Sequence, residues 1–225
     1  MCSKSFRTAS RYLAVVALFA LPLTGVANAA AVPDSIEART QRIRNGAGLS
    51  VGSWRPEEPT GFRHEGIPSF QGWLEKGLDL HLAWLNTVGY WHRRTTWTTS
   101  SVLTGTTSNE RQTHLVPTLT SLCLFPFTTP SSAIEPFVNA GVGPVFAVQK
   151  EKSTGAFGAA ENTTAIQTGF GIRAGAGVDV HMNSAFGLTV GGHFESASFD
   201  EKLAGQRMFQ GWGGDFGLTY KFQYH

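Results

Sequence analysis

The last part of the chain alternates strictly between apolar and polar side chains. The apolar series within residues 211–224 consists of Trp212, Gly214, Phe216, Leu218, Tyr220, Phe222 and Tyr224. The positions between them are Gly213, Asp215, Gly217, Thr219, Lys221 and Gln223. Because successive side chains of a strand point to opposite faces, this pattern predicts a β-strand with one apolar face and one polar face.

Similar alternation recurs along the chain and predicts eight strands. They cover residues 46–55, 67–75, 80–97, 110–125, 134–149, 163–180, 185–197 and a last stretch that begins near Arg207. Short connections at 76–79, 126–133 and 181–184 alternate with long connections at 56–66, 98–109, 150–162 and 198–205. This asymmetry is typical of bacterial membrane barrels, with short turns on one side and long connections on the other. We therefore predict an all-β fold, an eight-stranded antiparallel up-and-down transmembrane β-barrel.

A soluble barrel with eight alternating strands is the structural alternative. The lumen of an eight-stranded barrel is only just wide enough for side chains to fill it. Several bulky apolar residues from every strand would overfill that space, so the bulky face is expected to look outward into lipid. The fourth strand remains open at this stage, because either Leu115 and Leu119 or Val116, Leu122 and Leu124 could face outward. The orientation of Cys123 is open for the same reason.

The first 29 residues have the pattern of a cleaved signal peptide. Lys4, Arg7 and Arg11 precede the apolar stretch 13–21, and Ala27-Asn28-Ala29 supplies small residues for cleavage. We expect residues 1–29 to be a signal peptide, 30–45 a periplasmic lead-in and 46–225 the barrel domain. The expected location is the bacterial outer membrane.

Composition narrows the function further. The chain has 18 basic and 16 acidic residues, and removal of the signal leaves 15 against 16, a net charge of −1. A nucleic-acid binder is expected to be far more basic, so no nucleic-acid partner is predicted. No later segment has the roughly eighteen consecutive apolar residues of a transmembrane helix. Cys123 is the one cysteine after the signal, so no internal disulfide is expected, and we expect a monomer.

Charged residues on the predicted inner faces suggest a polar and largely filled lumen. This predicted lumen network consists of Arg93, Arg173, Asp179, His193, Glu195, Asp215 and Lys221. Arg173 and Asp215 fall at similar depth on strands that flank the seventh strand, and we expect them to pair, because an unpaired buried charge is costly. A second set of residues is expected to anchor the barrel at the two membrane interfaces. These aromatics are Trp54, Trp73, Tyr90, Phe186, Trp212 and Tyr224.

Catalytic and metal-binding patterns are weak. His193, Glu195 and Ser196 are the nearest approach to a catalytic set, but residues two apart on one strand share only a face, and catalysis needs a hydroxyl bonded to an oriented imidazole. The histidines show no HxH or Cys/His spacing of a metal site. We therefore expect no enzyme activity, no metal and no cofactor.

Two internal segments carry a family resemblance. Residues 135–143 read Glu-Pro-Phe-Val-Asn-Ala-Gly-Val-Gly, and residues 171–179 read Gly-Ile-Arg-Ala-Gly-Ala-Gly-Val-Asp. Together with the aromatic C-terminal strand, they resemble the small bacterial outer-membrane β-barrels of the OmpA, OmpX and OmpW type, the porin-family outer membrane protein β-barrel domains. The resemblance implies as partners the outer-membrane lipid with its lipopolysaccharide and, during assembly, the barrel-insertion machinery. It implies a structural or surface-facing role, with an OmpW-like narrow channel for small or apolar solutes or a lipid A-modifying enzyme as alternatives.

Overall fold

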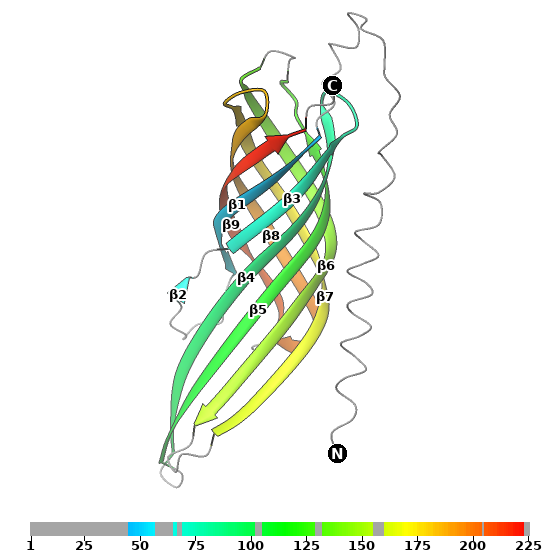
Figure 1. The fold of residues 1–225 in the computed structure, drawn as a ribbon. Helices are drawn as coiled ribbons and strands as arrows, with labels where there is room; N and C mark the ends of the chain where they lie inside the picture. The colour runs from blue at the N-terminus through cyan, green and yellow to red at the C-terminus, as the bar shows by residue number, and fades with distance from the viewer. Residues whose placement is uncertain are drawn as a thin grey trace, which may run out of the picture. The chain divides into compact units, whose positions relative to one another are not determined.

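The computed structural model describes residues 45–56, 65–66, 69–101, 105–128, 132–154, 160–203 and 205–222. These residues form one antiparallel sheet (Figure 1). Its strands are β1 (Asn45–Pro56), β2 (Glu65–Gly66), β3 (Ser69–Gly77), β4 (Leu82–Ser101), β5 (Gly105–Leu124), β6 (Ile134–Thr154), β7 (Ala160–His181), β8 (Phe186–Leu203) and β9 (Gln206–Lys221).

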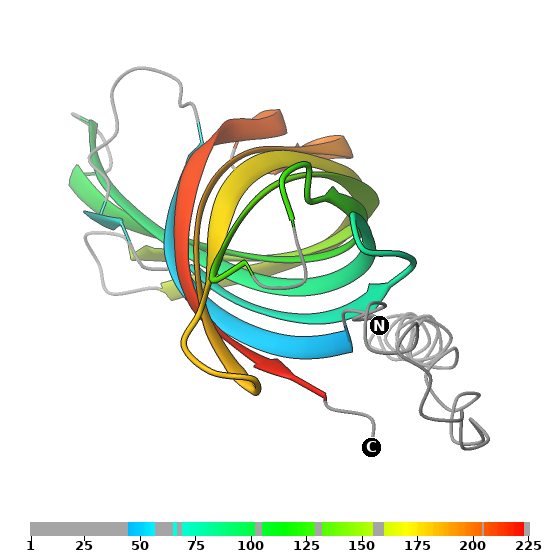
Figure 2. The same ribbon diagram turned by 90° about the horizontal axis from the view of Figure 1, so that it is seen from above.

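The sheet closes on itself as a barrel. Each of the eight long strands pairs with the next one along the chain, and β9 returns to pair with β1 between Gly46↔Lys221 and Pro56↔Gly211. Figure 2 looks down the resulting ring. The two-residue strand β2 lies outside the ring and pairs with β4 at Arg93 and Arg94. The predicted all-β, eight-stranded antiparallel up-and-down barrel is therefore confirmed.

A belt of large apolar side chains covers the outside of the barrel. All eight strands of the ring contribute to it, and the residues at least 45% exposed include Leu49, Val51, Phe70, Val88, Leu122, Leu124, Val138, Val142, Ile166, Phe170, Ile172, Val190, Met208, Trp212, Phe216, Leu218 and Tyr220. An apolar surface that encircles the molecule far exceeds the patches that soluble monomers expose. The belt is the surface of a membrane-spanning barrel, in which hydrocarbon solvates the outer face.

Short turns close one end of the barrel, where side chains stabilise them locally. Asp79 Oδ1 accepts hydrogen bonds from the backbone of His81 (2.6 Å) and Leu82 (2.7 Å), and Asn183 Oδ1 accepts them from Ala185 (2.9 Å) and Phe186 (2.8 Å). These are the Asx turns for which Asp and Asn are favoured.

At the other end, strands extend into three of the four stretches expected to be long loops. The β4–β5 pairing runs out to Ser101↔Gly105 and the β6–β7 pairing to Thr154↔Ala160. The β8–β9 hairpin continues to Leu203↔Gln206 with an irregular register after Ser198. Its tip residue Gly205 has φ +86°, a left-handed conformation that glycine adopts without strain. The expected bounds of the loops at 98–109, 150–162 and 198–205 are therefore wrong, because residues 98–101, 105–109, 150–154, 160–162 and 198–203 belong to strands; residues 102–104, 155–159 and 204 lie outside the described residues.

The strand phases differ from expectation at two aromatic residues. Trp54 is only 5% exposed and points into the barrel, and Trp73 lines an internal cavity. Their assignment to the membrane interface is wrong, since Leu49 and Val51 on β1 and Phe70 on β3 take the outward positions instead. The inner face accepts Trp73 because Gly48 lies against it: a Cβ at Gly48 would come within 2.2 Å of the Trp73 ring.

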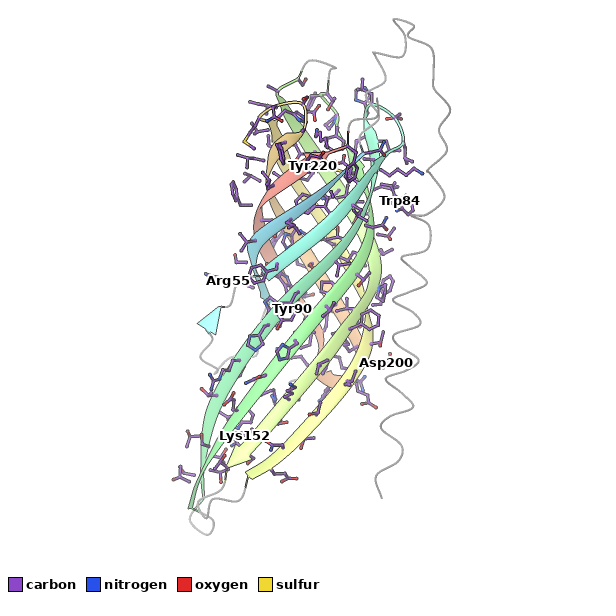
Figure 3. The ribbon with its side chains drawn as sticks, viewed as in Figure 1. Arg55, Trp84, Tyr90, Lys152, Asp200 and Tyr220 are labelled. Atoms are coloured by element: carbon purple, nitrogen blue, oxygen red, sulfur yellow. The ribbon has the colours of Figure 1, made fainter. Side chains whose placement is uncertain are left out.

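The other expected interface aromatics lie outward where the structure describes them. Tyr90, Phe186 and Trp212 are 40%, 40% and 72% exposed, whereas Tyr224 lies outside the described residues. Figure 3 shows the outward sticks of Tyr90, Trp84 and Tyr220.

On β5 the open question of phase is answered. Leu122 and Leu124 face outward, and the almost completely buried Leu115, Leu119 and Cys123 face the lumen.

The expected signal peptide and periplasmic lead-in, apart from Asn45, lie outside the described residues. Within the described residues, no helix is long and apolar enough to cross a membrane.

Candidate functional site in the barrel lumen

A network centred on Arg173 crosses the middle of the lumen. Arg173 Nη2 donates to Asp215 Oδ2 at 2.6 Å, and Arg173 Nη1 donates to the side-chain oxygen of Gln71. Gln71 Nε2 in turn donates to Asp215 Oδ1 at 3.0 Å. Because Gln71, Arg173 and Asp215 come from β3, β7 and β9, these bonds brace strands on different sides of the ring. The two residues placed at similar depth by the sequence are in direct contact.

His193 and Glu195 of β8 complete this network. His193 Nδ1 lies 2.8 Å from Asp215 Oδ2 and 2.9 Å from Arg173 Nη2, and Glu195 Oε2 lies 4.0 Å from Arg173 Nη1. The side chains of Arg173 and Asp215 are each 12% exposed, and those of Glu195 and His193 are 6% and 2% exposed. Charges removed from water to this extent need several partners each, and here they share one guanidinium.

A second polar cluster lies at the end of the barrel with the short turns. Glu135 bonds to His181 and lies 3.8 Å from Lys221 Nζ, which lies 3.0 Å from His181 Nε2. Thr189 donates to Asp179 at 2.6 Å and contacts the hydroxyl of Thr219 at 2.9 Å. Asp179 and Lys221 thus lie in a separate cluster from Arg173.

Arg93 is buried on the inner face of β4. It is 8% exposed and lies two residues beyond the buried Trp91. The predicted lumen residues thus lie at more than one level of the barrel.

An apolar cluster fills the lumen between the Arg173 network and the ends of the long hairpins. It consists of Trp54, Trp91, Leu115, Val145, Ala147, Ala197, Phe199, Leu203 and Phe209. Trp54 and Trp91 pack edge to face with ring centroids 5.3 Å apart. Their indole N–H groups donate to the backbone oxygens of Gly211 and Trp54, both at 3.1 Å, so no polar atom of either ring remains unpaired. The sequence did not indicate this apolar section. Trp91 shares a face with Arg93, which was predicted to point inward, but the other members were assigned to the outer face, to a loop or to no face.

A smaller apolar cluster lies nearer the short turns and bounds a cavity. Ala83, Cys123 and Phe125 form it, with Leu85 and Phe137 packed against them. Between this cluster and the Arg173 network is a cavity of about 70 Å³ lined by polar, charged and aromatic side chains. Since a water molecule needs about 10–15 Å³ of such space, the cavity has room for several waters. The lumen is therefore a stack of apolar and polar layers.

The arrangement at His193 provides only part of a catalytic site. Asp215 orients the imidazole through Nδ1, as an acid does in a catalytic triad. The other nitrogen, Nε2, has no hydrogen-bond partner among the described residues and abuts Gly213, whose added Cβ would lie 2.5 Å away. Within the same described part of the chain, no group of three His, Cys, Asp or Glu side chains is arranged to hold a metal ion.

Sequence reasoning missed three members of these clusters. Glu135 and His181 lie at predicted turns. Gln71 shares a face with Trp73 and Glu75, so the assignment of Trp73 to the outer face excluded Gln71 from the lumen.

Comparisons with known proteins return small outer-membrane barrels. The chain is 13% identical to the attachment invasion locus protein Ail of Yersinia pestis, solved with the heparin analogue sucrose octasulfate, with a TM-score of 0.47, covering 80% of this chain and 99% of that one. It is 11% identical to OprG of Pseudomonas aeruginosa, with a TM-score of 0.47 and coverage of 83% and 99%. The N-terminal barrel of OprF from the same organism is 14% identical, with a TM-score of 0.43 and coverage of 80% and 100%. No family model and no curated protein matches the chain.

Proposed function

We propose that this protein is a bacterial outer-membrane barrel with a structural or surface-facing role and a lumen closed to solutes. The observation that carries the proposal is the apolar cluster that fills the lumen beyond the Arg173 network. A hydrated ion would have to pass both a cross-linked set of buried charges and an apolar layer that includes tryptophan and phenylalanine rings. Two independent barriers in series favour a closed barrel over a channel.

The long hairpins support a surface-facing role. β4, β5, β6 and β7 have 20, 20, 21 and 22 residues, about twice the 9–11 that a membrane strand needs, so they extend well beyond the apolar belt. Figure 1 shows these four strands running past the rest of the barrel. Bacterial barrels have their longer connections outside the cell, so the hairpins would face the cell exterior.

The lumen offers no complete set of catalytic groups. The acid and imidazole of Asp215 and His193 are present, but Nε2, which would activate a nucleophile, meets the backbone of Gly213. We therefore propose no enzymatic role.

Conductance of the purified full-length protein in planar bilayers tests the closed lumen. The wild-type protein is expected to give no discrete current steps, with heat-modifiable migration on a gel as the check that the barrel is folded. Arg173→Ala is also expected to be silent, because the apolar cluster stays in place. Steps in the wild type would support the alternative of a narrow channel, and steps only in Arg173→Ala would make the charged network the sole barrier; either result contradicts the proposal.

A further inference from the structure

A cationic cluster lies on the outer surface of β4, β5 and β6, immediately beyond the apolar belt. Its members, here called the rim cluster, are Tyr90, His92, Arg94, His114, Lys150 and Lys152. His92 is directly opposite His114, and Gln112 is opposite both Arg94 and Lys150. Lys150 is consequently a diagonal neighbour of His114, within about 7–8 Å between their backbones. Figure 3 shows Tyr90 and Lys152 on the outer face of the same wall.

The two histidines are held in a defined arrangement. Their rings stack with centroids 4.5 Å apart, and the Tyr90 hydroxyl contacts His114 Nδ1 at 2.8 Å. When this hydroxyl donates to Nδ1, a neutral His114 carries its proton on Nε2 and offers it as a hydrogen-bond donor. In that state the cluster presents a donor from His114 between the guanidinium of Arg94 and the ammonium groups of the two lysines.

The cluster has an excess of positive charge. Glu110 is the one carboxylate among the described outward residues of β4, β5 and β6, and it is bound by Arg94 at 3.0 Å and by Gln112 at 2.6 Å. Lys152 is also directly opposite Glu110, but the single carboxylate cannot balance Arg94, Lys150 and Lys152, so the cluster keeps a net positive charge even when both histidines are neutral. Partial burial, followed by Arg94, lowers the pKa of His92, and partial burial, followed by His92 and Lys150, lowers the pKa of His114. The positive charges of the site therefore exceed its negative charge.

The position of the cluster indicates what kind of anion it fits. Val88 and Tyr90, at 53% and 40% exposure, are the last belt residues of β4, and His92 is the next outward residue on the same face. An amphiphile could place its acyl chains along Val88 and Val142 and its head group at the rim. Phosphate accepts several charge-assisted hydrogen bonds from such donors.

We propose that the rim cluster binds the phosphate groups of a lipid anchored in the outer leaflet. This inference rests on the proposed function, which places this end of the barrel at the cell exterior. A matching site is not formed on the β8 wall, where Ser196, Ser198 and Asp200 occupy the outward positions beyond Phe194.

The test measures binding of lipid A to the full-length protein folded in neutral detergent micelles. The variant His92→Ala/His114→Ala/Lys150→Gln is expected to bind bis-phosphorylated lipid A about tenfold more weakly or worse, since it loses several charge-assisted contacts. Lys202→Gln, which removes an exposed positive charge from β8, is the matched control and should leave the dissociation constant within about twofold. Wild-type protein should lose the same factor when the lipid A has been dephosphorylated.

Three results would overturn the proposal: equal affinity for dephosphorylated lipid A, an equal loss in Lys202→Gln, or binding of inorganic phosphate as tight as that of the lipid. If the triple variant does not fold, the single variant Lys150→Gln replaces it. The measurement is then an NMR titration of His114 in the wild type and in this variant. Bound phosphorylated lipid should raise the pKa of His114 in the wild type and raise it less in Lys150→Gln. An unchanged pKa of His114 in the wild type would contradict phosphate binding at the rim cluster. Because binding in micelles does not depend on the lumen, this test and the conductance test fail separately.

Discussion

Removing Arg173 is expected to destabilise the barrel severely. Arg173→Met takes away the hydrogen bonds to Gln71 and Asp215, the contact with His193 at 2.9 Å, and the cation 4.0 Å from Glu195. The carboxylates of Asp215 and Glu195 then remain in the lumen without their guanidinium. Breaking a buried ion pair by removing one partner costs about 3–5 kcal/mol, because the other charge stays buried and uncompensated. We expect a loss in this range.

Equilibrium urea unfolding in lipid vesicles measures the loss, and a double-mutant cycle shows its origin. Asp215→Asn alone and Arg173→Met alone should both destabilise, whereas the double variant should cost less than their sum, with a coupling free energy of about 1–3 kcal/mol. Arg94→Met is the matched control, since the Arg94–Glu110 pair is exposed and worth less than about 1 kcal/mol. A loss below about 1 kcal/mol for Arg173→Met, or additive effects in the cycle, would show that Arg173 and Asp215 do not form a buried, coupled ion pair.

Two further predictions concern the part of the barrel outside the membrane. In intact cells, a cysteine introduced by Lys152→Cys should react with a membrane-impermeant maleimide, whereas Leu78→Cys at the short-turn end should not; the reverse labelling would invert the proposed orientation. Hydrogen bonds from Gln112 and then Arg94 lower the pKa of Glu110, so Gln112→Ala should raise that pKa toward its ordinary value in an NMR titration. A lowered carboxylate pKa adds stability above the unfolded-state pKa that disappears as the pH falls through the folded-state value, and an unshifted titration in Gln112→Ala would remove this assignment.

The direction of the side chains was predicted best on strands whose two faces differ most in polarity. On β7, and on β9 after Phe209, the large apolar residues face outward and small, polar or charged residues face inward, so the face of Arg173 and Asp215 followed from alternation alone. On β1 and β3 both faces carry a large aromatic or apolar residue. Trp54 and Trp73 point inward because glycines such as Gly48 leave room for them, and strand periodicity contains no information about that cross-strand space.

The long hairpins were missed for a different physical reason. Beyond the apolar belt both faces of the β4–β7 strands meet water or other polar groups, so alternation disappears while pairing continues to Ser101↔Gly105 and Thr154↔Ala160. Ser/Thr-rich segments without alternation were therefore taken for loops. The direct pairing of His92 with His114 could not be predicted from the sequence either, because it depends on the register between β4 and β5.

The fold and the proposed function both depend on the bulky apolar face looking outward into hydrocarbon. Fluorescence quenching by lipids with brominated acyl chains tests it directly in variants that retain a single tryptophan. Trp212, 72% exposed on the outside of β9, should be strongly quenched, and Trp54, 5% exposed inside the barrel, should be nearly unaffected. Strong quenching of Trp54 with protection of Trp212 would contradict the account.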